Sequence, residues 1–161
     1  MERTSGDHGF IEYVVEKYSD MVVRIAYQNL KNQADDEDVT QEVFIKLLKQ
    51  PDFNDEEHLK AWLIRVTINQ CKDLRKSAWF RKRQPLDEQW KPRGEKQLGI
   101  LDEIWKLPKD DRNVIYLYYY ENYTVPEIAR ILGKNENTIS SRLTRARKKL
   151  KIILAEEGVK I

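Results

Sequence analysis

The chain has 161 residues, of which 40% are hydrophobic and 35% charged, and its formal net charge is +2. This length and composition allow one or two small domains with compact helical cores, and they exclude an obviously disordered protein. The single cysteine excludes an internal disulfide, and no apolar run approaches the roughly 18 residues of a membrane-spanning helix. Because the N-terminus also lacks a secretory signal pattern, we expect a cytosolic protein.

The first two predicted helices are amphipathic. One runs from about residue 10 to residue 30, and its inner stripe is Ile11, Val14, Val15, Tyr18, Val22, Ile25 and Ala26. The next begins at Asp35, where an acidic first turn suits the positive end of the helix dipole. Its predicted inner residues are Val39, Val43, Leu47 and Leu48, and its other faces carry Asp36, Glu37, Thr40, Gln41 and Phe44. The acids alone indicate dipole compensation, but an exposed Phe44 beside them favours a docking surface.

A third helix is predicted to begin near Asp55, with a buried side and a cationic side. The buried side is Leu59, Trp62, Leu63, Val66 and Leu74, and the rest carries Arg65, Asn69, Lys72, Asp73, Arg75 and Lys76. Cations attract phosphates, an amide hydrogen-bonds to bases, and Trp79 and Phe80 at the helix end offer stacking, as single-strand binding requires. The alternative is that the tryptophans are core residues, which we favour for Trp62 and leave open for Trp79.

Residues 80–97 have no sustained apolar period and contain two prolines and a glycine, which is typical of a linker. A second helical unit then begins, with Leu98, Leu101, Ile104 and Trp105 at helical spacing and a further helix from Asp110. The predicted fold class is therefore all-α. Two small helical domains, residues 1–79 and 98–161, are joined by a flexible linker, residues 80–97.

The second domain is predicted to contain a helix-turn-helix between residues 122 and 154. Thr124 and Glu127 have the spacing of a capping box, and Pro126 lies in the first turn of the same helix. Gly133 permits the left-handed turn that ends it. Residues 135–138 supply new capping side chains, and the buried stripe of the second helix is Ile139, Leu143, Ala146 and Leu150.

The outward face of this second helix is suited to nucleic acid. It carries Ser140, Ser141, Thr144, Arg145 and Lys148, and residues 137–151 include six basic side chains and no acidic one. Short hydroxyls let a helix approach base edges, while Arg and Lys reach bases or phosphates. The alternative is a helix pair in a bundle with a solvated basic face, which we disfavour because such faces normally mix both signs.

The sequence carries no recognisable catalytic, metal or cofactor site. His8 and His58 stand alone without metal-ligand spacing, and no glycine-rich phosphate loop occurs. The carboxylates cluster at helix starts and do not form an evident acid and base pair. We therefore expect no enzymatic activity, no metal and no cofactor.

Five blocks that occur in order along the chain resemble a known family. They are Asp36-Glu-Asp-Val-Thr-Gln-Glu-Val-Phe44, Trp62-Leu-Ile-Arg-Val-Thr-Ile-Asn69, Leu107-Pro108, Glu127-Ile-Ala-Arg-Ile-Leu-Gly133 and Thr138-Ile-Ser-Ser-Arg-Leu-Thr-Arg-Ala-Arg147. Over nearly the whole chain, these blocks resemble bacterial RNA polymerase sigma factors of the extracytoplasmic-function group. The resemblance implies that the first domain reads the −10 promoter element and that the second reads the −35 element.

The resemblance also implies roles for single residues. Binding to the largest subunit of core polymerase is implied for Asp38, Gln41, Glu42 and Phe44, and residues 101–120 would meet the flap of the other large subunit. Reading of an unpaired −10 base is implied for Asn69 with the loop of residues 52–59, and phosphate contacts for Arg65, Lys72, Arg75 and Lys76. The −35 duplex would meet Asn137, Thr138, Ser140, Ser141, Thr144, Arg145 and Lys148, with Arg142 and Arg147 at the DNA backbone or a neighbouring helix.

The expected partners are core polymerase, promoter DNA and an anti-sigma protein, which in this family is often membrane-bound and would hold the chain at the membrane. We expect no insertion into the membrane by the chain itself and no obligate homo-oligomer. The alternative function is a free-standing helix-turn-helix regulator, which normally needs a dimer to span two half-sites. Nothing in the sequence resembles a coiled-coil dimerisation segment, and the cationic third helix would have no purpose in such a protein.

Overall fold

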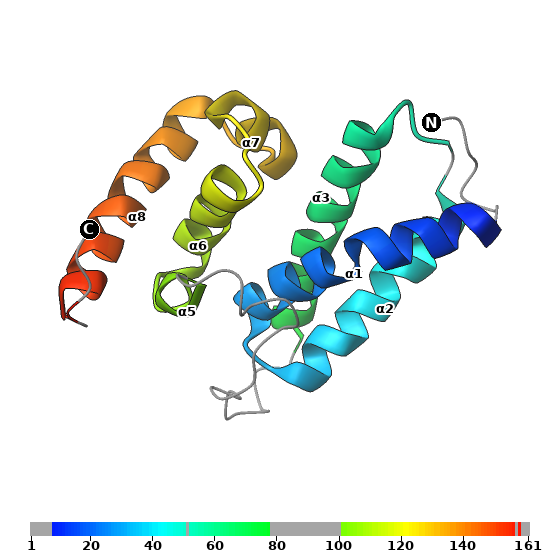
Figure 1. Cartoon of the computed structure of the whole chain (residues 1–161), viewed down its shortest axis with the longest axis horizontal. Helices are drawn as coiled ribbons and strands as arrows, with labels where there is room; N and C mark the ends of the chain where they lie inside the picture. The colour runs from blue at the N-terminus through cyan, green and yellow to red at the C-terminus, as the bar shows by residue number, and fades with distance from the viewer. Residues whose placement is uncertain (1–7, 51, 78–100, 157, 159–161) are drawn as a thin grey trace. The chain divides into compact units, whose positions relative to one another are not determined.

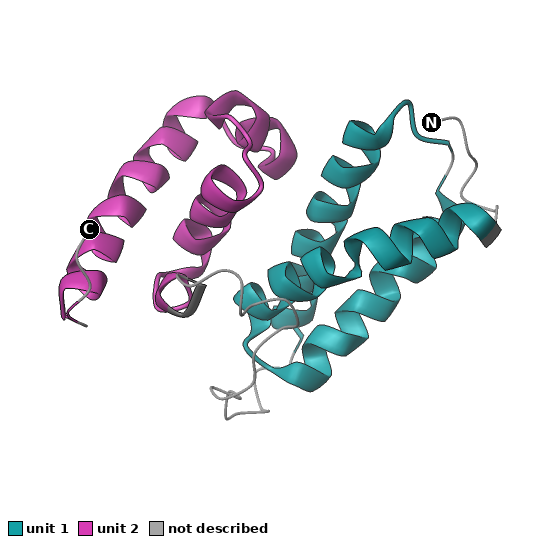
Figure 2. Ribbon diagram, in the orientation of Figure 1, with its two compact units in different colours: residues 1–94 teal, residues 95–161 magenta. Residues whose placement is uncertain are grey.

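The computed structural model describes residues 8–50, 52–77, 101–156 and 158 (Figure 1). Every regular element in these residues is a helix, which confirms the predicted all-α class. The chain divides into two compact units, Met1–Gly94 and Glu95–Ile161 (Figure 2). The proposed linker, residues 80–97, and the aromatic residues Trp79 and Phe80 lie outside the described residues.

Three helices pack around one core in the first unit. Helix α1 (His8–Leu30) and helix α2 (Gln33–Lys49) form an antiparallel pair, and helix α3 (Glu56–Arg75) packs on both (Figure 1). The core side chains come from all three helices and include Val14, Val22, Ile25, Val39, Val43, Leu47, Leu59, Leu63 and Ile64. Most of the predicted inner stripes are therefore confirmed.

Three residues of this unit lie on a different face from the predicted one. Val15 and Leu48, which were expected inside, are 37% and 54% exposed, whereas Asp36, expected outside, is fully buried. The helical period gives the centre of an inner stripe, but the packing of neighbouring helices decides which residues on its edges are covered. Asp36 lies in the first turn of α2, and this helix begins two residues earlier than predicted. The start is fixed by Asn32, whose side chain accepts a hydrogen bond from the Asp35 N–H (3.1 Å).

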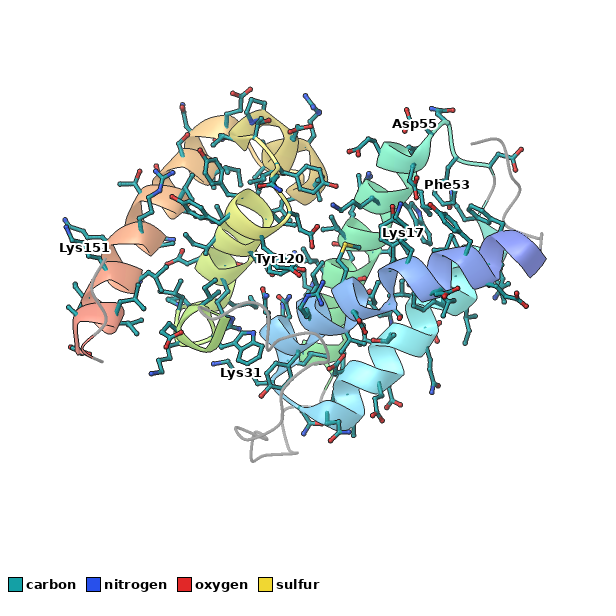
Figure 3. The ribbon with its side chains drawn as sticks, viewed as in Figure 1. Lys17, Lys31, Phe53, Asp55, Tyr120 and Lys151 are labelled. Atoms are coloured by element: carbon teal, nitrogen blue, oxygen red, sulfur yellow. The ribbon has the colours of Figure 1, made fainter. Side chains whose placement is uncertain are left out.

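The segment before α3 is packed against the first unit. Phe53, labelled in Figure 3, is 5% exposed. The centre of its ring lies 5.5 Å from that of Trp62 and 5.2 Å from that of His58. Asp55 caps α3 by accepting a hydrogen bond from the His58 N–H (2.8 Å). The aromatic ring and the cap together hold this segment on the start of α3.

The second unit is built around its last helix. Helix α8 (Glu136–Glu156) packs on α5 (Leu101–Ile104), α6 (Lys109–Ile115) and α7 (Val125–Leu132). The buried side chains include Ile104, Leu107, Val114, Leu117, Ile128, Ile139, Leu143 and Ala146. The predicted helix start at Leu98 lies outside the described residues.

Helices α7 and α8 form the predicted helix-turn-helix. The capping box is present, with the Glu127 N–H donating to Thr124 Oγ1 (3.3 Å) and the Thr124 N–H donating to Glu127 Oε1 (2.9 Å). Gly133 has a φ of 66°, in the left-handed region, and ends α7. Asn135 Oδ1 accepts from the Thr138 N–H (2.8 Å) at the start of α8. Leu150 of the predicted stripe is only half-buried.

One element of this unit was not predicted. Helix α6 continues into a π-helical turn, η2 (Tyr116–Tyr120), where the sequence indicated an ordinary helix. The phenol of Tyr116 donates to Glu121 Oε2 (2.6 Å), and its ring stacks on that of Tyr120 at 5.0 Å. A π-helical turn accommodates one extra residue, and this residue changes which tyrosines face α8.

Candidate nucleic-acid interface

One face of α3 gathers cations around an amide. Arg65, Asn69, Lys72 and Lys76 are all exposed, and their spacing places them on a single face of the helix. The opposite face of α3 contributes Leu63, Thr67 and Cys71 to the core. Three positive charges beside a hydrogen-bonding amide form a surface that can follow a phosphate backbone and contact a base.

Arg75, which was expected on the same face, lies on the flank of α3. It is half-buried, and its Nη1 donates to the backbone oxygen of Asn29 near the end of α1 (3.1 Å). A cation at the carbonyl end of a helix is favourable because it complements the helix dipole. Arg75 therefore has a structural partner within the unit, and the α3 face consists of the other four residues.

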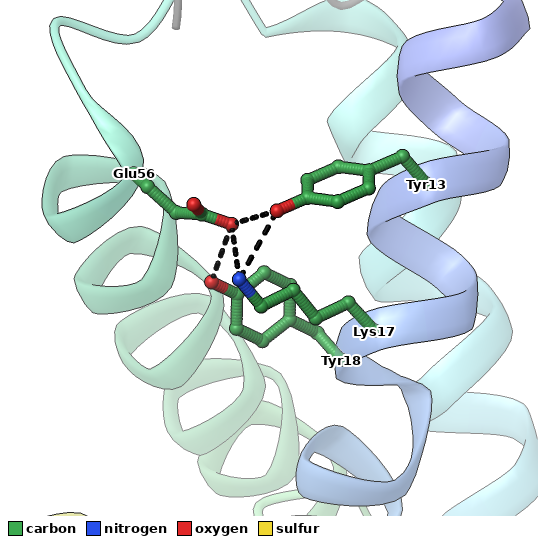
Figure 4. A network of polar contacts seen from close by, with 4 residues as sticks. All are labelled: Tyr13, Lys17, Tyr18 and Glu56. Atoms are coloured by element: carbon green, nitrogen blue, oxygen red, sulfur yellow. Dashed lines mark hydrogen bonds and ion pairs between the residues drawn. The ribbon is translucent and has the colours of Figure 1, made fainter.

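A polar network ties the beginning of α3 to α1 (Figure 4). Glu56 Oε1 accepts from Lys17 Nζ (2.8 Å), from the Tyr18 hydroxyl (3.0 Å) and from the Tyr13 hydroxyl. The hydrogen bonds from Lys17 and Tyr13 hold the pKa of Glu56 at about 2, and the bond that Lys17 donates to Glu56 raises the pKa of Lys17. This network could not be predicted from the sequence, because Glu56 lies 38 to 43 residues from its three donors.

A second contact fixes the segment of residues 52–55 from its other side. The Asn54 N–H donates to Nδ1 of His58 (3.1 Å), so this imidazole acts as an acceptor. His58, which stands alone in the sequence without metal-ligand spacing, therefore positions the loop. The side-chain amide of Asn54 is exposed and has no hydrogen-bond partner among the residues that the structure describes.

The outer face of α2 combines polar and apolar side chains. Asp38 and Gln41 are exposed, and Glu42 is half-buried beside them. Ile45 and Leu48 continue this face with exposed fractions of 45% and 54%, although Leu48 was expected inside and Ile45 was not predicted to belong to a docking face. Phe44, expected to be exposed, is half-buried on the flank of the helix. Apolar side chains in a row on an exposed helix face are typical of a protein-docking surface.

The inner face of α2 carries an unusual buried acid. Asp36 is fully buried, its Oδ2 has no hydrogen-bond partner among the described residues, and Thr40 Oγ1 lies 3.4 Å from its Oδ1. Burial disfavours the charged form and raises the pKa of Asp36 to about 8. This acid therefore belongs to the core and not to the docking face.

The predicted DNA-facing residues of α8 are mostly exposed. Asn137, Ser140, Ser141, Thr144, Arg145 and Lys148 are exposed, while Thr138 and Arg142 are half-buried. Ser141, Thr144 and Lys148 occupy one helical face, on the side away from Ile139, Leu143 and Ala146, which face the core. This face has the short hydroxyls and the cation that major-groove contact requires.

Four cationic side chains of α8 contact residues of α6 and η2. Arg145 donates from Nη2 to Asp111 Oδ1 (2.7 Å) and from Nε to Asp111 Oδ2 (3.2 Å), and Lys149 Nζ lies 3.5 Å from Asp111 Oδ2. Arg142 lies 3.7 Å from Asp110. Arg147 donates from Nε to the Tyr119 hydroxyl (2.5 Å), which raises the pKa of Arg147. Arg142 and Arg147 were expected at the DNA backbone or a neighbouring helix, and within this unit they lie against α6 and η2.

The described residues offer neither a metal-binding cluster nor a membrane-spanning helix. Within the described part of the chain, no three His, Cys, Asp or Glu residues are grouped so that they could hold a metal ion. None of the described helices has the length and apolar character needed to cross a bilayer.

Comparison with known proteins identifies the family. Residues 14–81 match the family model for sigma-70 region 2, and residues 98–150 match the model for sigma-70 region 4. RNA polymerase sigma factor SigV of Bacillus subtilis is 30% identical over 142 residues, which cover 84% of this chain and 86% of SigV. The chain belongs to the RNA polymerase sigma factor family, in its extracytoplasmic-function group. This confirms the resemblance inferred from the five sequence blocks.

Other proteins similar to this sigma factor support the same family assignment. SigL of Mycobacterium tuberculosis, an extracytoplasmic-function sigma factor, is 29% identical, and the alignment covers 99% of both chains. The solved structure of CnrH, in complex with the cytosolic domain of CnrY, superposes with a TM-score of 0.67 at 25% identity, covering 94% of this chain and 92% of CnrH. The sigma factor RpoE of Bartonella quintana, in complex with the anti-sigma factor NepR, has the same fold, with a TM-score of 0.72 at 20% identity, and covers 89% of this chain and 96% of its own.

Proposed function

We propose that this sigma factor uses three separate surfaces to direct RNA polymerase to promoters. The outer face of α2 binds core polymerase, the cationic face of α3 binds the unpaired non-template strand of the −10 element, and the exposed face of α8 reads the −35 duplex. Each surface is a single helix face, and each has the chemistry that its ligand requires.

The face of α3 is the observation that carries this proposal. Arg65, Lys72 and Lys76 surround Asn69 on one exposed face, whereas the core lies on the opposite face. The packed segment of residues 52–55 leads directly into this helix and presents the Asn54 amide. A rigid loop next to a cationic helix supports the capture of an unpaired base with its phosphates.

The energies explain why the chain must act with polymerase. Separation of a DNA duplex costs about 1.4 kcal/mol per stacked step, and a captured base returns about 1 to 3 kcal/mol by stacking. A few captured bases cannot offset the melting of a long bubble. The cationic polymerase supplies the remaining contacts, so we expect the free chain, with its net charge of +2, to bind promoters poorly.

The partners follow from the same surfaces. Core polymerase and promoter DNA are the proposed ligands, and an anti-sigma protein is the proposed inhibitor, as the complex of the related CnrH with the cytosolic domain of CnrY supports. We propose that the chain acts in the cytoplasm without catalysing a reaction, and that a membrane-bound anti-sigma protein would hold it at the membrane. No obligate homo-oligomer is required, because one chain carries all three surfaces.

A free-standing helix-turn-helix regulator is the alternative function. It would use α7 and α8 but would leave the exposed faces of α2 and α3 without a role. Pull-down with purified core polymerase separates the two: the sigma factor binds the core, and a free-standing regulator does not.

Run-off transcription with core polymerase and a promoter library tests the proposal. Asn69→Ala is expected to alter −10 preference, because it removes the amide at the centre of the α3 face. Gln70→Ala is the matched control, because this neighbouring amide accepts from Lys46 Nζ of α2 (2.5 Å) and lies off the face. Unchanged −10 preference in Asn69→Ala, or failure of the wild-type chain to direct any specific start, would contradict the proposal.

A further inference from the structure

The basic residues of α8 are not equally available to DNA. Six basic side chains lie between residues 137 and 151, and four of them, Arg142, Arg145, Arg147 and Lys149, contact α6 or η2. Lys148 and Lys151 are exposed and have no partner among the described residues; Lys151 projects from the outer side of α8 (Figure 3). Contacts within the second unit therefore hold four of the six basic side chains of its DNA-facing helix.

Asp111 contacts two of these four cations, Arg145 and Lys149. Its side chain is 0% exposed, whereas the side chains of Arg145 and Lys149 are 51% and 44% exposed. A carboxylate away from water is strongly unfavourable unless cations and hydrogen bonds compensate it. Arg145 and Lys149 provide this compensation, together with the positive end of α6, where Asp111 lies in the first turn.

The geometry of the pair orients Arg145. Its Nε and Nη2 each donate to a different oxygen of Asp111, at 3.2 and 2.7 Å, which fixes the plane of the guanidinium. Both N–H groups of Nη1 remain, and half of the side chain is exposed. Arg145 can therefore still donate to DNA, but from one orientation and with part of its charge compensated.

Orientation and charge affect DNA binding in different ways. Non-specific affinity depends on how many cations neutralise phosphates, and it falls steeply with salt. Sequence discrimination depends on donors held in a fixed geometry at base edges. A buried carboxylate that holds an arginine on the surface of α8 therefore weakens non-specific affinity and strengthens sequence discrimination.

We infer that Asp111 is a positioning residue, which makes Arg145 a selective contact at the −35 duplex instead of a general phosphate binder. This inference rests on the proposed function of α8. The simpler explanation is that the pair only holds α6 against α8. The positioning role and the purely structural role predict different effects of losing the carboxylate on the salt dependence of DNA binding and on promoter discrimination.

The first test measures binding of the full chain to random-sequence duplex over a salt series. Asp111→Asn is expected to make the slope of log K against log salt steeper by about 0.9, because Arg145 then neutralises one more phosphate. Glu156→Gln is the matched control, because it removes one negative charge from the same unit, at an exposed position of α8 without a partner in the described part of the chain. An unchanged slope in Asp111→Asn, or the same change in Glu156→Gln, would overturn the inference.

The second test uses holoenzyme and compares transcription from promoters with the preferred −35 element and with a scrambled one. The ratio is expected to fall about fivefold or more in Asp111→Asn, as for loss of one oriented base contact. Arg145→Lys should lower the ratio by a similar factor while keeping the salt slope, because lysine keeps the charge but cannot form the forked pair. Since Arg145→Lys retains a cation for Asp111, it remains informative if Asp111→Asn does not fold.

The outcomes separate this inference from the proposed function. A wild-type holoenzyme that discriminates between the two promoters, together with unchanged ratios in Asp111→Asn and Arg145→Lys, would overturn the positioning role alone. A wild-type holoenzyme without discrimination at the −35 element would overturn the role of α8 in promoter reading, and the inference with it.

Discussion

Lys17 Nζ lies 2.8 Å from Glu56 Oε1, and this ion pair joins α1 to the first turn of α3. The Tyr13 and Tyr18 hydroxyls donate to the same oxygen, so the carboxylate is stabilised by three donors. The pKa of Glu56 is lowered from 4.5 to about 2, first by Lys17 and then by Tyr13. The stabilisation is thus fully present above pH 4.5 and is lost as the pH falls through about 2.

We expect Glu56→Gln to lower the free energy of unfolding at pH 7 by about 1 kcal/mol, a modest value because water screens this partly exposed pair. The variant should also lose less stability than the wild type between pH 5 and pH 2.5. Urea denaturation at several pH values measures both effects. Glu57→Gln is the control, since Glu57 is the exposed neighbour of Glu56 and has no partner among the residues described. Equal pH dependence in Glu56→Gln and the wild type would contradict the role of the network.

Asp36 should have the opposite pH dependence. Its pKa is raised from 3.8 to about 8 by burial, so the folded chain keeps a proton that the unfolded chain releases between these values. Stability is therefore expected to fall as the pH rises from 3.8 to about 8. Asp36→Asn should be more stable than the wild type by about 1 to 3 kcal/mol at pH 8.5 and nearly equal at pH 4.

Thermal and urea denaturation at the two pH values check this expectation. Asp38→Asn provides the control, because it removes an exposed acid two residues away on the same helix. A stabilisation by Asp36→Asn that is the same at pH 4 and pH 8.5 would show that titration of this carboxyl is not the cause.

Gly133 gives a test of the turn between α7 and α8. Its φ is 66°, and a Cβ built at this position would meet nothing within 4 Å. The cost of a side chain there is conformational and not steric. We expect Gly133→Ala to lose about 1 to 2 kcal/mol of stability and Gly133→Asn clearly less, because asparagine tolerates the left-handed region. Urea denaturation of the two variants measures their free energies of unfolding. Equal losses of stability in both variants would contradict the conformational explanation.

The exposed apolar residues of α2 give a prediction about polymerase binding. Ile45→Lys and Leu48→Lys are each expected to weaken binding to core polymerase about fivefold or more, because they place a charge within the proposed interface. Their stability should change by less than about 0.5 kcal/mol, since both side chains are exposed. Titration of labelled sigma factor with core polymerase measures the affinity.

Val15→Lys is the matched control for this prediction. Val15 is an apolar residue of the same unit, 37% exposed, but it lies on α1. Equal weakening by Val15→Lys and by the α2 variants would indicate a general effect of charge, and the proposed docking face on α2 would be wrong.

The sequence predicted the helical faces well because their pattern is local. The spacing of Ile139, Leu143 and Ala146 indicated the buried side of α8, and these residues are buried. The capping box of Thr124 and Glu127 was equally visible, since both partners lie within one turn of the chain. Family membership likewise followed from short blocks in a fixed order.

Features that depend on distant residues could not be predicted. Arg145 and Asp111 are 34 residues apart, and Glu56 lies 39 residues from Lys17. No periodic pattern reports such pairs, because they arise only when helices pack. The burial of Asp36 was missed for a related reason: an acid near a helix start normally faces solvent, whereas the packing of α2 on α1 and α3 buries this one. The residue roles in polymerase and promoter binding remain predictions.

The π-helical turn at Tyr116–Tyr120 has a consequence for evolution. Such a turn equals an α-helical turn with one inserted residue, so the helix on its N-terminal side keeps its frame while everything after it is rotated. A homologue with one residue fewer between α6 and α7 could therefore preserve both helices and lose only the presentation of Tyr119 to Arg147. Alignments of this family should place a single-residue gap here and compensate it by substitutions at these two positions.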